Sequence, residues 1–233
     1  MRILLNGANG RTGKVVRRLI DQNPAYELVA AVDAFSGEGY LRTLNDFAGE
    51  ADCVIDFSHP SATDALLEFA CARRLPLVIA TTGQTDAQRA AIQAAGAQIP
   101  VFFSANMSPA IALLAGMARQ TARMFPDADI EIIEKHHNRK LDMPSGTALM
   151  LARALQAQRE DAERMIGIHS LRMGNEVGTH EIIIATGTQT ITLKHEAEDR
   201  ALFAEGALAA AAFIVSEPNG VYNMHDFLNR KGQ

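Results

Sequence analysis

The sequence predicts an α/β protein with two parts, an N-terminal Rossmann-like parallel sheet that binds a dinucleotide and a C-terminal α+β domain with a mixed sheet. Three observations support this fold class. A glycine-rich turn joins a short apolar strand to a helix at the start of the chain. Apolar strands and helical patterns then alternate as far as residue 103. After residue 164, three strand patterns follow one another with little helix between them.

The first strand, turn and helix have the pattern of a dinucleotide-binding site. Arg2–Asn6 is apolar, Gly7–Gly13 has the spacing G-x-x-G-x-x-G, and Lys14–Ile20 is helical in pattern. Glycines at this spacing allow a tight turn and a close approach of the backbone to a pyrophosphate. A second strand, Glu27–Val32, ends at Asp33, where an acidic side chain can bind the adenosine ribose hydroxyls. A purely structural glycine turn is the rival interpretation.

Alternating strands and helices continue this first domain. Strands are predicted at 52–56, 77–80 and 99–103, and helices at 61–74 and 86–95. The order predicts an open parallel sheet with right-handed crossovers and a ligand crevice at the carboxyl ends of its strands. Small polar residues follow those ends at 57–60, 81–83 and 104–107. A nicotinamide and its ribose would lie there, although each segment is equally compatible with a plain loop.

The pattern changes after a long predicted helix at Ser108–Arg123. The strands expected beyond it lie at 129–134, 165–171, 180–186 and 190–195. They predict a sheet with one face covered by helices or by another subunit. An alanine-rich helix from Ala201 to Pro218 then returns to the first domain. We therefore expect a dinucleotide-binding domain of residues 1–107 and 207–233, and a substrate-binding and oligomerisation domain of residues 108–206.

The stretch Glu131–Ala148 gathers the side chains most suited to catalysis. Its strand delivers His136 and His137 to the carboxyl end, and Lys140 on the following loop adds a cation and a proton donor. Pro144 then precedes a helix whose first turn is expected to offer free N–H groups at residues 145–147. The stretch therefore predicts an anion-binding site beside two bases.

Only one of the two adjacent histidines is expected to serve as the acid. Neighbours on a strand face opposite ways, and mutual repulsion discourages double protonation. We assign the proton transfer to His136, because an imidazole titrates near neutrality. Simpler interpretations are a surface histidine pair and an ordinary helix cap. A metal site would use His136, His137, His169 or His180, but no cysteine lies nearby and Lys140 stands at a ligand spacing, so we predict no metal.

Composition excludes several classes of protein. The net charge is −5 and no basic run is present, so no nucleic-acid partner is expected. No apolar stretch reaches membrane-spanning length, and no signal peptide is expected. Cys53 and Cys71 fall in a strand and a helix pattern, which favours buried thiols over a disulfide. These features predict a cytoplasmic enzyme.

The motif His-His-x-x-Lys-x-Asp-x-Pro-Ser-Gly-Thr-Ala at residues 136–148 closely resembles the signature of the 4-hydroxy-tetrahydrodipicolinate reductase family. The glycine turn, the length and the segment His169–Gly174 also fit, so the resemblance extends over essentially the whole chain. It implies reduction of 4-hydroxy-tetrahydrodipicolinate by NAD(P)H in lysine and diaminopimelate biosynthesis. It also implies a homotetramer formed through the second-domain sheets.

The resemblance implies roles for individual residues. His136 would donate or accept the proton and Lys140 would donate one. The substrate would be held by His137, Ser145, Gly146 and Thr147. The cofactor would be held by Gly7, Ala8, Asn9, Gly10, Arg11, Thr12, Asp33, Ala80, Thr81, Thr82, Ser104, Ala105, Asn106 and Met107.

Two other functions stay open on the residues alone. One is another nicotinamide-dependent dehydrogenase of the same two-domain plan, because fold alone does not choose the reaction. The other is a nucleotide-sensing module, which has no use for the histidine and lysine cluster. For the cofactor, Asp33 favours NADH, and Ala34 offers no cation for a 2′-phosphate. Arg11 on the glycine turn is expected to reach that phosphate and to leave NADPH usable.

Overall fold

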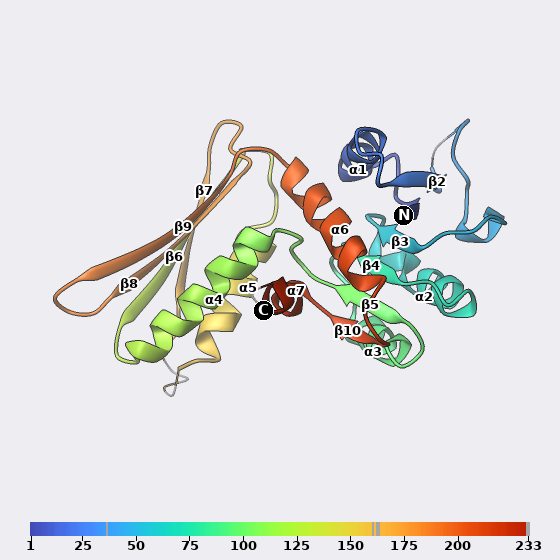
Figure 1. Cartoon of the computed structure of the whole chain (residues 1–233). Helices are drawn as coiled ribbons and strands as arrows, with labels where there is room; N and C mark the ends of the chain where they lie inside the picture. The colour runs from blue at the N-terminus through green and yellow to red at the C-terminus, as the bar shows by residue number, and fades with distance from the viewer. Residues whose placement is uncertain (36, 160, 162–163, 232–233) are drawn as a thin grey trace. The chain divides into compact units, whose positions relative to one another are not determined.

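The protein divides into two compact units in the computed structural model, which describes residues 1–35, 37–159, 161 and 164–231 (Figure 1). The first unit is Met1–Met107 together with Ala201–Gln233, and the second is Ser108–Arg200. One unit contains a parallel sheet and the other a mixed sheet. The predicted fold class is therefore confirmed.

The first unit is built on a six-stranded parallel sheet with the order β10-β5-β4-β3-β1-β2. The strands are β1 (Arg2–Asn6), β2 (Glu27–Val32), β3 (Cys53–Asp56), β4 (Leu77–Ile79), β5 (Pro100–Phe103) and β10 (Gly220–Tyr222). The first five follow the predicted apolar runs closely, because all five are mostly apolar and β1, β3 and β4 are almost entirely buried. The short edge strand β10 was not predicted.

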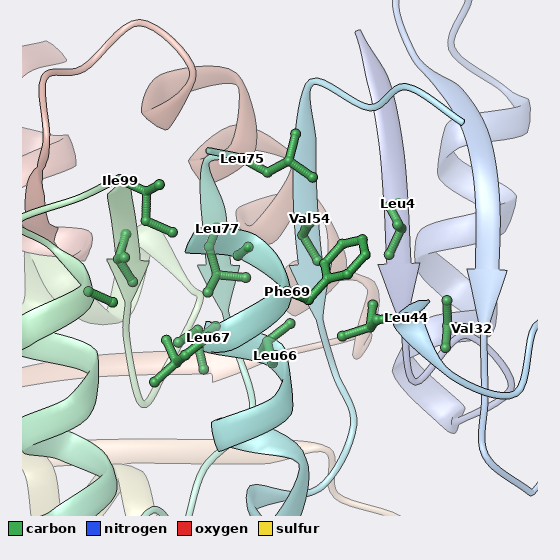
Figure 2. Close-up of a cluster of buried hydrophobic side chains, with 14 of the residues drawn as sticks. Leu4, Val32, Leu44, Val54, Leu66, Leu67, Phe69, Leu75, Leu77 and Ile99 are labelled. Carbon is green, nitrogen blue, oxygen red and sulfur yellow. The ribbon is translucent and has the colours of Figure 1, made fainter. Parts of the chain in front are cut away.

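Helices cover both faces of this sheet. They are α1 (Arg11–Asp21), α2 (Thr63–Ala72), α3 (Asp86–Ala95), α6 (Ala201–Ile214) and α7 (Met224–Lys231). Figure 2 shows the side chains of α2 packed against Leu4, Val54 and Leu77 of the sheet. Successive strand residues point to opposite faces, and Phe102 contacts Phe213 of α6 on the other side. No helix in the described ranges is long and apolar enough to cross a membrane.

The segment after β2 forms a loop that returns to the sheet. The chain leaves the sheet at Val32 and returns beside it at Leu41, with which Val32 forms a parallel bridge. The Asp33 N–H donates to the Leu41 carbonyl and the Leu41 N–H donates to the Ala31 carbonyl, both at 2.9 Å. A short helical turn, η1 (Leu44–Asp46), follows. Residues 41–43 are therefore fixed beside the carboxyl end of β2.

The second unit contains a four-stranded mixed sheet with the order β7-β6-β8-β9. Its strands are β6 (Asp129–His136), β7 (Gly167–Arg172), β8 (Gly178–Ala185) and β9 (Thr190–Ala197). Strand β6 is parallel to β7 and antiparallel to β8, which is antiparallel to β9. Helices α4 (Pro109–Met124) and α5 (Gly146–Gln156) pack on one face, where Ile132 and Ile182 are fully buried (Figure 1).

The opposite face of the mixed sheet alternates charged and apolar side chains. Ile133 and Ile183 lie on it half-buried, and Glu131 and Lys194 lie on it exposed. A face with partly exposed isoleucines, on which none of the described helices packs, has the character of an association surface.

Helix α6 brings the chain back to the first unit. It runs without a break from Ala201, so the whole helix belongs to that unit, whereas the sequence placed the boundary at residue 207. Gly206 faces the backbone of Met107, and a Cβ atom there would overlap the Met107 carbonyl oxygen. The close approach depends on glycine having no side chain.

We expect Gly206→Ala to lower the free energy of unfolding by about 1–3 kcal/mol, because the helix must move away from buried backbone to admit a methyl group. The matched control is Gly116→Ala in α4, where a Cβ atom would meet nothing within 4 Å. That control should stabilise the protein by about 0.5–1 kcal/mol, through helix propensity. Urea unfolding measures both, and equal stabilities would contradict the close contact.

Candidate functional site

The glycine turn of the first unit packs against neighbouring backbone too closely to admit side chains. Gly7 has a φ of +75°, and a Cβ atom there would overlap the Phe57 carbonyl. A Cβ atom at Gly13 would overlap the Gly7 carbonyl. Helix α1 begins directly after Gly10, so the first-turn N–H groups of the helix point towards the turn. This geometry suits a phosphate group at the helix N-terminus.

A cavity of about 420 Å³ opens beside this turn. Its lining includes Gly7, Gly10, Asp33, Arg42 and His59. It therefore lies at the carboxyl ends of β1, β2 and β3, where open α/β sheets bind ligands. Its size matches a small-molecule site.

Asp33 is tied to the glycine turn by hydrogen bonds. Its Oδ2 accepts from the Asn9 N–H at 3.1 Å, and its Oδ1 accepts from the Phe35 N–H at 3.2 Å. The Tyr40 hydroxyl donates to the Asn9 Oδ1 at 3.2 Å and accepts from Arg17 at 2.5 Å. The two loops that border the cavity are thus joined to each other.

The other cofactor candidates lie along the same sheet edge. Ala80–Thr82 follow β4, and the Ala80 N–H donates to the Asp56 carbonyl. Ser104–Met107 follow β5, and the Ser104 hydroxyl donates to the Asn106 carbonyl at 2.7 Å. Because all these strands are parallel, the structure brings both segments to the edge that carries Gly7–Thr12 and Asp33. They are not among the described residues that line the cavity beside the turn.

A buried carboxylate organises the chemistry of the second unit. Glu134 of β6 is fully buried. Its two oxygens accept from both terminal nitrogens of Arg172, at 2.8 and 2.7 Å. The same carboxylate accepts from the Ser145 N–H at 3.2 Å and bonds the Nδ1 of His136 at 2.5 Å. Glu134 therefore joins β6, β7 and the start of α5.

The donors around Glu134 keep it ionised. Burial alone would raise its pKa, but the hydrogen bonds from Arg172 and His136 outweigh burial and lower the pKa to about 2. An ionised carboxylate only accepts hydrogen bonds, so the His136 Nδ1 must carry the proton. The Nε2 of neutral His136 is then the atom with a lone pair.

The surroundings of His136 keep the imidazole neutral and its outer nitrogen uncovered. Burial lowers the pKa of His136 in spite of the Glu134 charge, and the positive charge of Lys140 acts in the same direction. Gly178 of β8 lies opposite, where a Cβ atom would come within 3.0 Å of the His136 Nε2. The missing side chain leaves that nitrogen room to exchange a proton.

Ser145 is engaged by the protein at each of its polar atoms. Its hydroxyl accepts from the Ala148 N–H at 3.2 Å and lies 3.1 Å from the Nε2 of His180, while its N–H donates to Glu134. The prediction of a free N–H at Ser145 is therefore wrong, because a buried carboxylate occupies that donor. Burial, followed by the charge of His136, lowers the pKa of His180 to about 4.

The remaining predicted residues lie near this centre. His137 follows β6, and its Nε2 accepts from Arg200 at 2.7 Å. Lys140 is paired with Asp142, with both carboxylate oxygens 2.8 Å from its Nζ. Gly146 begins α5, and Thr147 is the next residue of its first turn. Within the described part of the chain, no group of three His, Cys, Asp or Glu side chains is placed to hold a metal ion.

The sequence analysis did not assign Glu134 or Arg172 to this centre, and it considered His180 only as a metal ligand. Glu134 lies two residues before His136 on one strand, so the period of two already placed them on one face. Arg172 and His180 come from β7 and β8. Their proximity follows from strand register, which pairs His136 with Arg172 and Glu134 with His180.

A parallel sheet with a glycine turn, joined in one chain to a mixed-sheet unit that carries an ordered imidazole, is the plan of two-domain nicotinamide-dependent oxidoreductases. Family models described as "Dihydrodipicolinate reductase, N-terminus" and "Dihydrodipicolinate reductase, C-terminus" match residues 1–107 and 110–228. The chain belongs to the dihydrodipicolinate reductase family.

Individual relatives agree with this family. A protein of Caldanaerobacter subterraneus subsp. tengcongensis, named 4-hydroxy-tetrahydrodipicolinate reductase, is 39% identical in an alignment that covers 99% of each chain. A protein of the same name from an Exiguobacterium species is 40% identical and covers 96% of this chain and 94% of its own. The solved structure of a dipicolinate-bound dihydrodipicolinate reductase from Paenisporosarcina sp. TG-14 has a TM-score of 0.77 at 24% identity, with 96% and 97% coverage. It supports the fold.

We expect the stability of the protein to fall as the pH is lowered from about 6.5 towards 4, because His180 has a pKa of about 4 when folded and 6.5 when unfolded. In that window the unfolded chain binds more protons, so the free energy of unfolding decreases with decreasing pH, by on the order of 3 kcal/mol. The free energy of unfolding, measured with urea at pH 8 and at pH 5, should differ less for His180→Gln than for the wild type. The exposed His169→Gln serves as the control, and equal differences in all three proteins would contradict the assignment.

Proposed function

We propose that the protein reduces 4-hydroxy-tetrahydrodipicolinate to tetrahydrodipicolinate with loss of water, using NADH or NADPH, in lysine and diaminopimelate biosynthesis. Each turnover consumes one reduced cofactor and one proton and releases water and the oxidised cofactor. The observation that carries the proposal is the Glu134-ordered His136 beside Lys140 and the start of α5. Membership of the family supports the choice of substrate.

Side chains of the protein itself supply the proton for the reaction. A bound reduced nicotinamide supplies a hydride, and electron density then builds on the substrate away from the carbon that receives it. His136 can present a proton there from Nε2, because Glu134 holds its Nδ1. Lys140 supplies a second proton donor and a fixed positive charge. The lowered pKa of His136 means that this imidazole takes up its proton most readily when an anionic ligand raises that pKa.

The substrate is a dicarboxylate, and positive potential in the second unit suits it. The N-terminus of α5 at Gly146 and Thr147 attracts one carboxylate, and Ser145 holds that helix start in place. Lys140 can exchange Asp142 for the other carboxylate, since its side chain is partly exposed. His137, held by Arg200, is assigned to substrate binding as well.

The first unit suits the dinucleotide. The glycine turn, the start of α1 and the cavity beside Asp33 would hold its pyrophosphate and adenosine. We assign the nicotinamide end to Ala80–Thr82 and Ser104–Met107. NADH is preferred in this assignment, because the Asp33 carboxylate accepts hydrogen bonds from the ribose hydroxyls.

We further propose that the protein is a cytoplasmic homotetramer. The open face of the mixed sheet supports association, because it exposes isoleucines between charged residues and lies opposite the face that α4 and α5 cover. The charged side chains of Glu131 and Lys194 would then fix the register of the partners.

Lys140→Ala should lose at least about 100-fold in kcat, because a positioned acid and a fixed charge are lost together. His136→Ala should behave likewise, and both should still bind reduced cofactor. Oxidation of reduced cofactor with freshly generated 4-hydroxy-tetrahydrodipicolinate measures turnover, and cofactor fluorescence measures binding. The control is Arg139→Ala, which removes a cation of the same loop that bonds Asn175 and should keep most of the turnover. Near-native turnover of Lys140→Ala, or activity only with semialdehyde substrates, would refute the proposed function.

Glu134→Gln should lower kcat and move the pH profile, because the Glu134 charge raises the pKa of His136. Without that charge the imidazole stays protonated only at lower pH, so the limb of the kcat profile that reports protonated His136 should shift to lower pH. Gln retains the size of the side chain and can still accept from the His136 Nδ1. A fall in kcat with an unmoved profile would show a purely structural role.

A further inference from the structure

The adenosine end of the first-unit cavity carries a cation that the sequence pattern did not reveal. Arg42 lines the cavity together with Asp33. Its Nη1 donates to the Ala34 carbonyl at 2.9 Å. Ala34 directly follows Asp33, so the guanidinium group lies beside the residue assigned to the ribose hydroxyls. This is where a phosphate on the ribose 2′-oxygen would lie.

The backbone next to Arg42 is held beside the end of β2 without a ligand. Its neighbour Leu41 is hydrogen-bonded to both Ala31 and Asp33 and forms a parallel bridge with Val32. Arg42 lies nine positions after Asp33 in the sequence, but this pairing brings the two together at the end of β2. The backbone therefore needs no rearrangement to bring this cation to the cavity.

The guanidinium group is available to a new anion. Within the described residues, Arg42 takes part in no salt bridge, and its hydrogen bond to Ala34 uses one of its five N–H donors. The fork geometry of arginine suits a phosphate group, to which two N–H groups can donate in parallel.

Asp33 opposes a phosphate less than a solitary carboxylate would. Both of its oxygens already accept backbone N–H groups, from Asn9 and from Phe35. Arg17 adds a second positive charge to the same network through the Tyr40 hydroxyl. The site therefore combines an acceptor for ribose hydroxyls with donors for a phosphate.

Arg11, the cation expected from the sequence, is placed differently. It is the first residue of α1 and is exposed. It is not among the described residues that line the cavity, whereas Arg42 is. Substitution of Arg11 and substitution of Arg42 should therefore have different effects on the binding of a 2′-phosphate.

We propose that Arg42 is the specificity-determining residue that binds the 2′-phosphate of NADPH, so that the site takes both dinucleotides. This inference rests on the proposed function, because it takes the cavity to be the adenosine site of the cofactor. It assigns the discrimination between NADPH and NADH to the segment that rejoins β2 and not to the glycine turn.

The test compares adenosine 2′,5′-bisphosphate with 5′-AMP, which differ only in the 2′-phosphate. Calorimetric titration of the full chain should show that the wild type binds both nucleotides. Arg42→Gln should weaken the bisphosphate about tenfold relative to 5′-AMP, because a charge-assisted hydrogen bond is lost. For Arg42→Lys, the affinity for the bisphosphate relative to 5′-AMP should lie between the values for the wild type and for Arg42→Gln. The ratio of kcat/KM for NADPH to that for NADH should fall about tenfold in Arg42→Gln as well.

Two further variants make the outcome decisive. Arg18→Gln removes the same charge from an exposed position on α1 and should leave the ligand ratio unchanged. A change in the ratio with Arg11→Gln but not with Arg42→Gln would overturn the inference and would assign the phosphate to the glycine turn. Binding of neither nucleotide by the wild type would overturn the cofactor site itself. Binding of 5′-AMP with an unaltered ratio in Arg42→Gln would overturn this inference alone.

Discussion

The second unit depends on the burial of a single negative charge. A carboxylate as deeply enclosed as Glu134 is tolerated only when donors replace the water that it has lost. Arg172, His136 and the Ser145 backbone supply those donors from β7, from β6 and from the start of α5. Loss of any one donor leaves the charge undercompensated, so the three segments are held in one arrangement.

The same arrangement explains why one imidazole can be both fixed and neutral. Glu134 and Arg172 together carry no net charge, so burial dominates the pKa of His136 and lowers it. The hydrogen bond to Glu134 still sets which nitrogen carries the proton. Glu134 thus orients the imidazole and opposes the fall in its pKa, while desolvation has the larger effect and lowers that pKa.

Much of the fold could be predicted because strong local signals determine it. Apolar runs indicated the first five strands of the parallel sheet, and α3 begins at Asp86, where the sequence placed it. Strand β10 was missed because its three residues are too few for a periodic pattern. Helix α7 was missed as well, and both elements form against elements already in place.

The candidate site likewise contains residues that a local pattern revealed and residues that it did not. His136 and Lys140 lie in one short motif and were found from it. Arg172 and Arg42 reach their places only through strand register and through the bridge between Val32 and Leu41. Those pairings join residues distant in sequence, so no local pattern contains them.

The return of α6 has a consequence for the order in which the protein can form during synthesis. The second unit is one continuous segment, so all of its strands and helices have been made before residue 201 leaves the ribosome. The first unit needs α6 and β10 to cover and to complete its sheet. The part of the chain that is translated first is therefore the last to acquire its full set of partners.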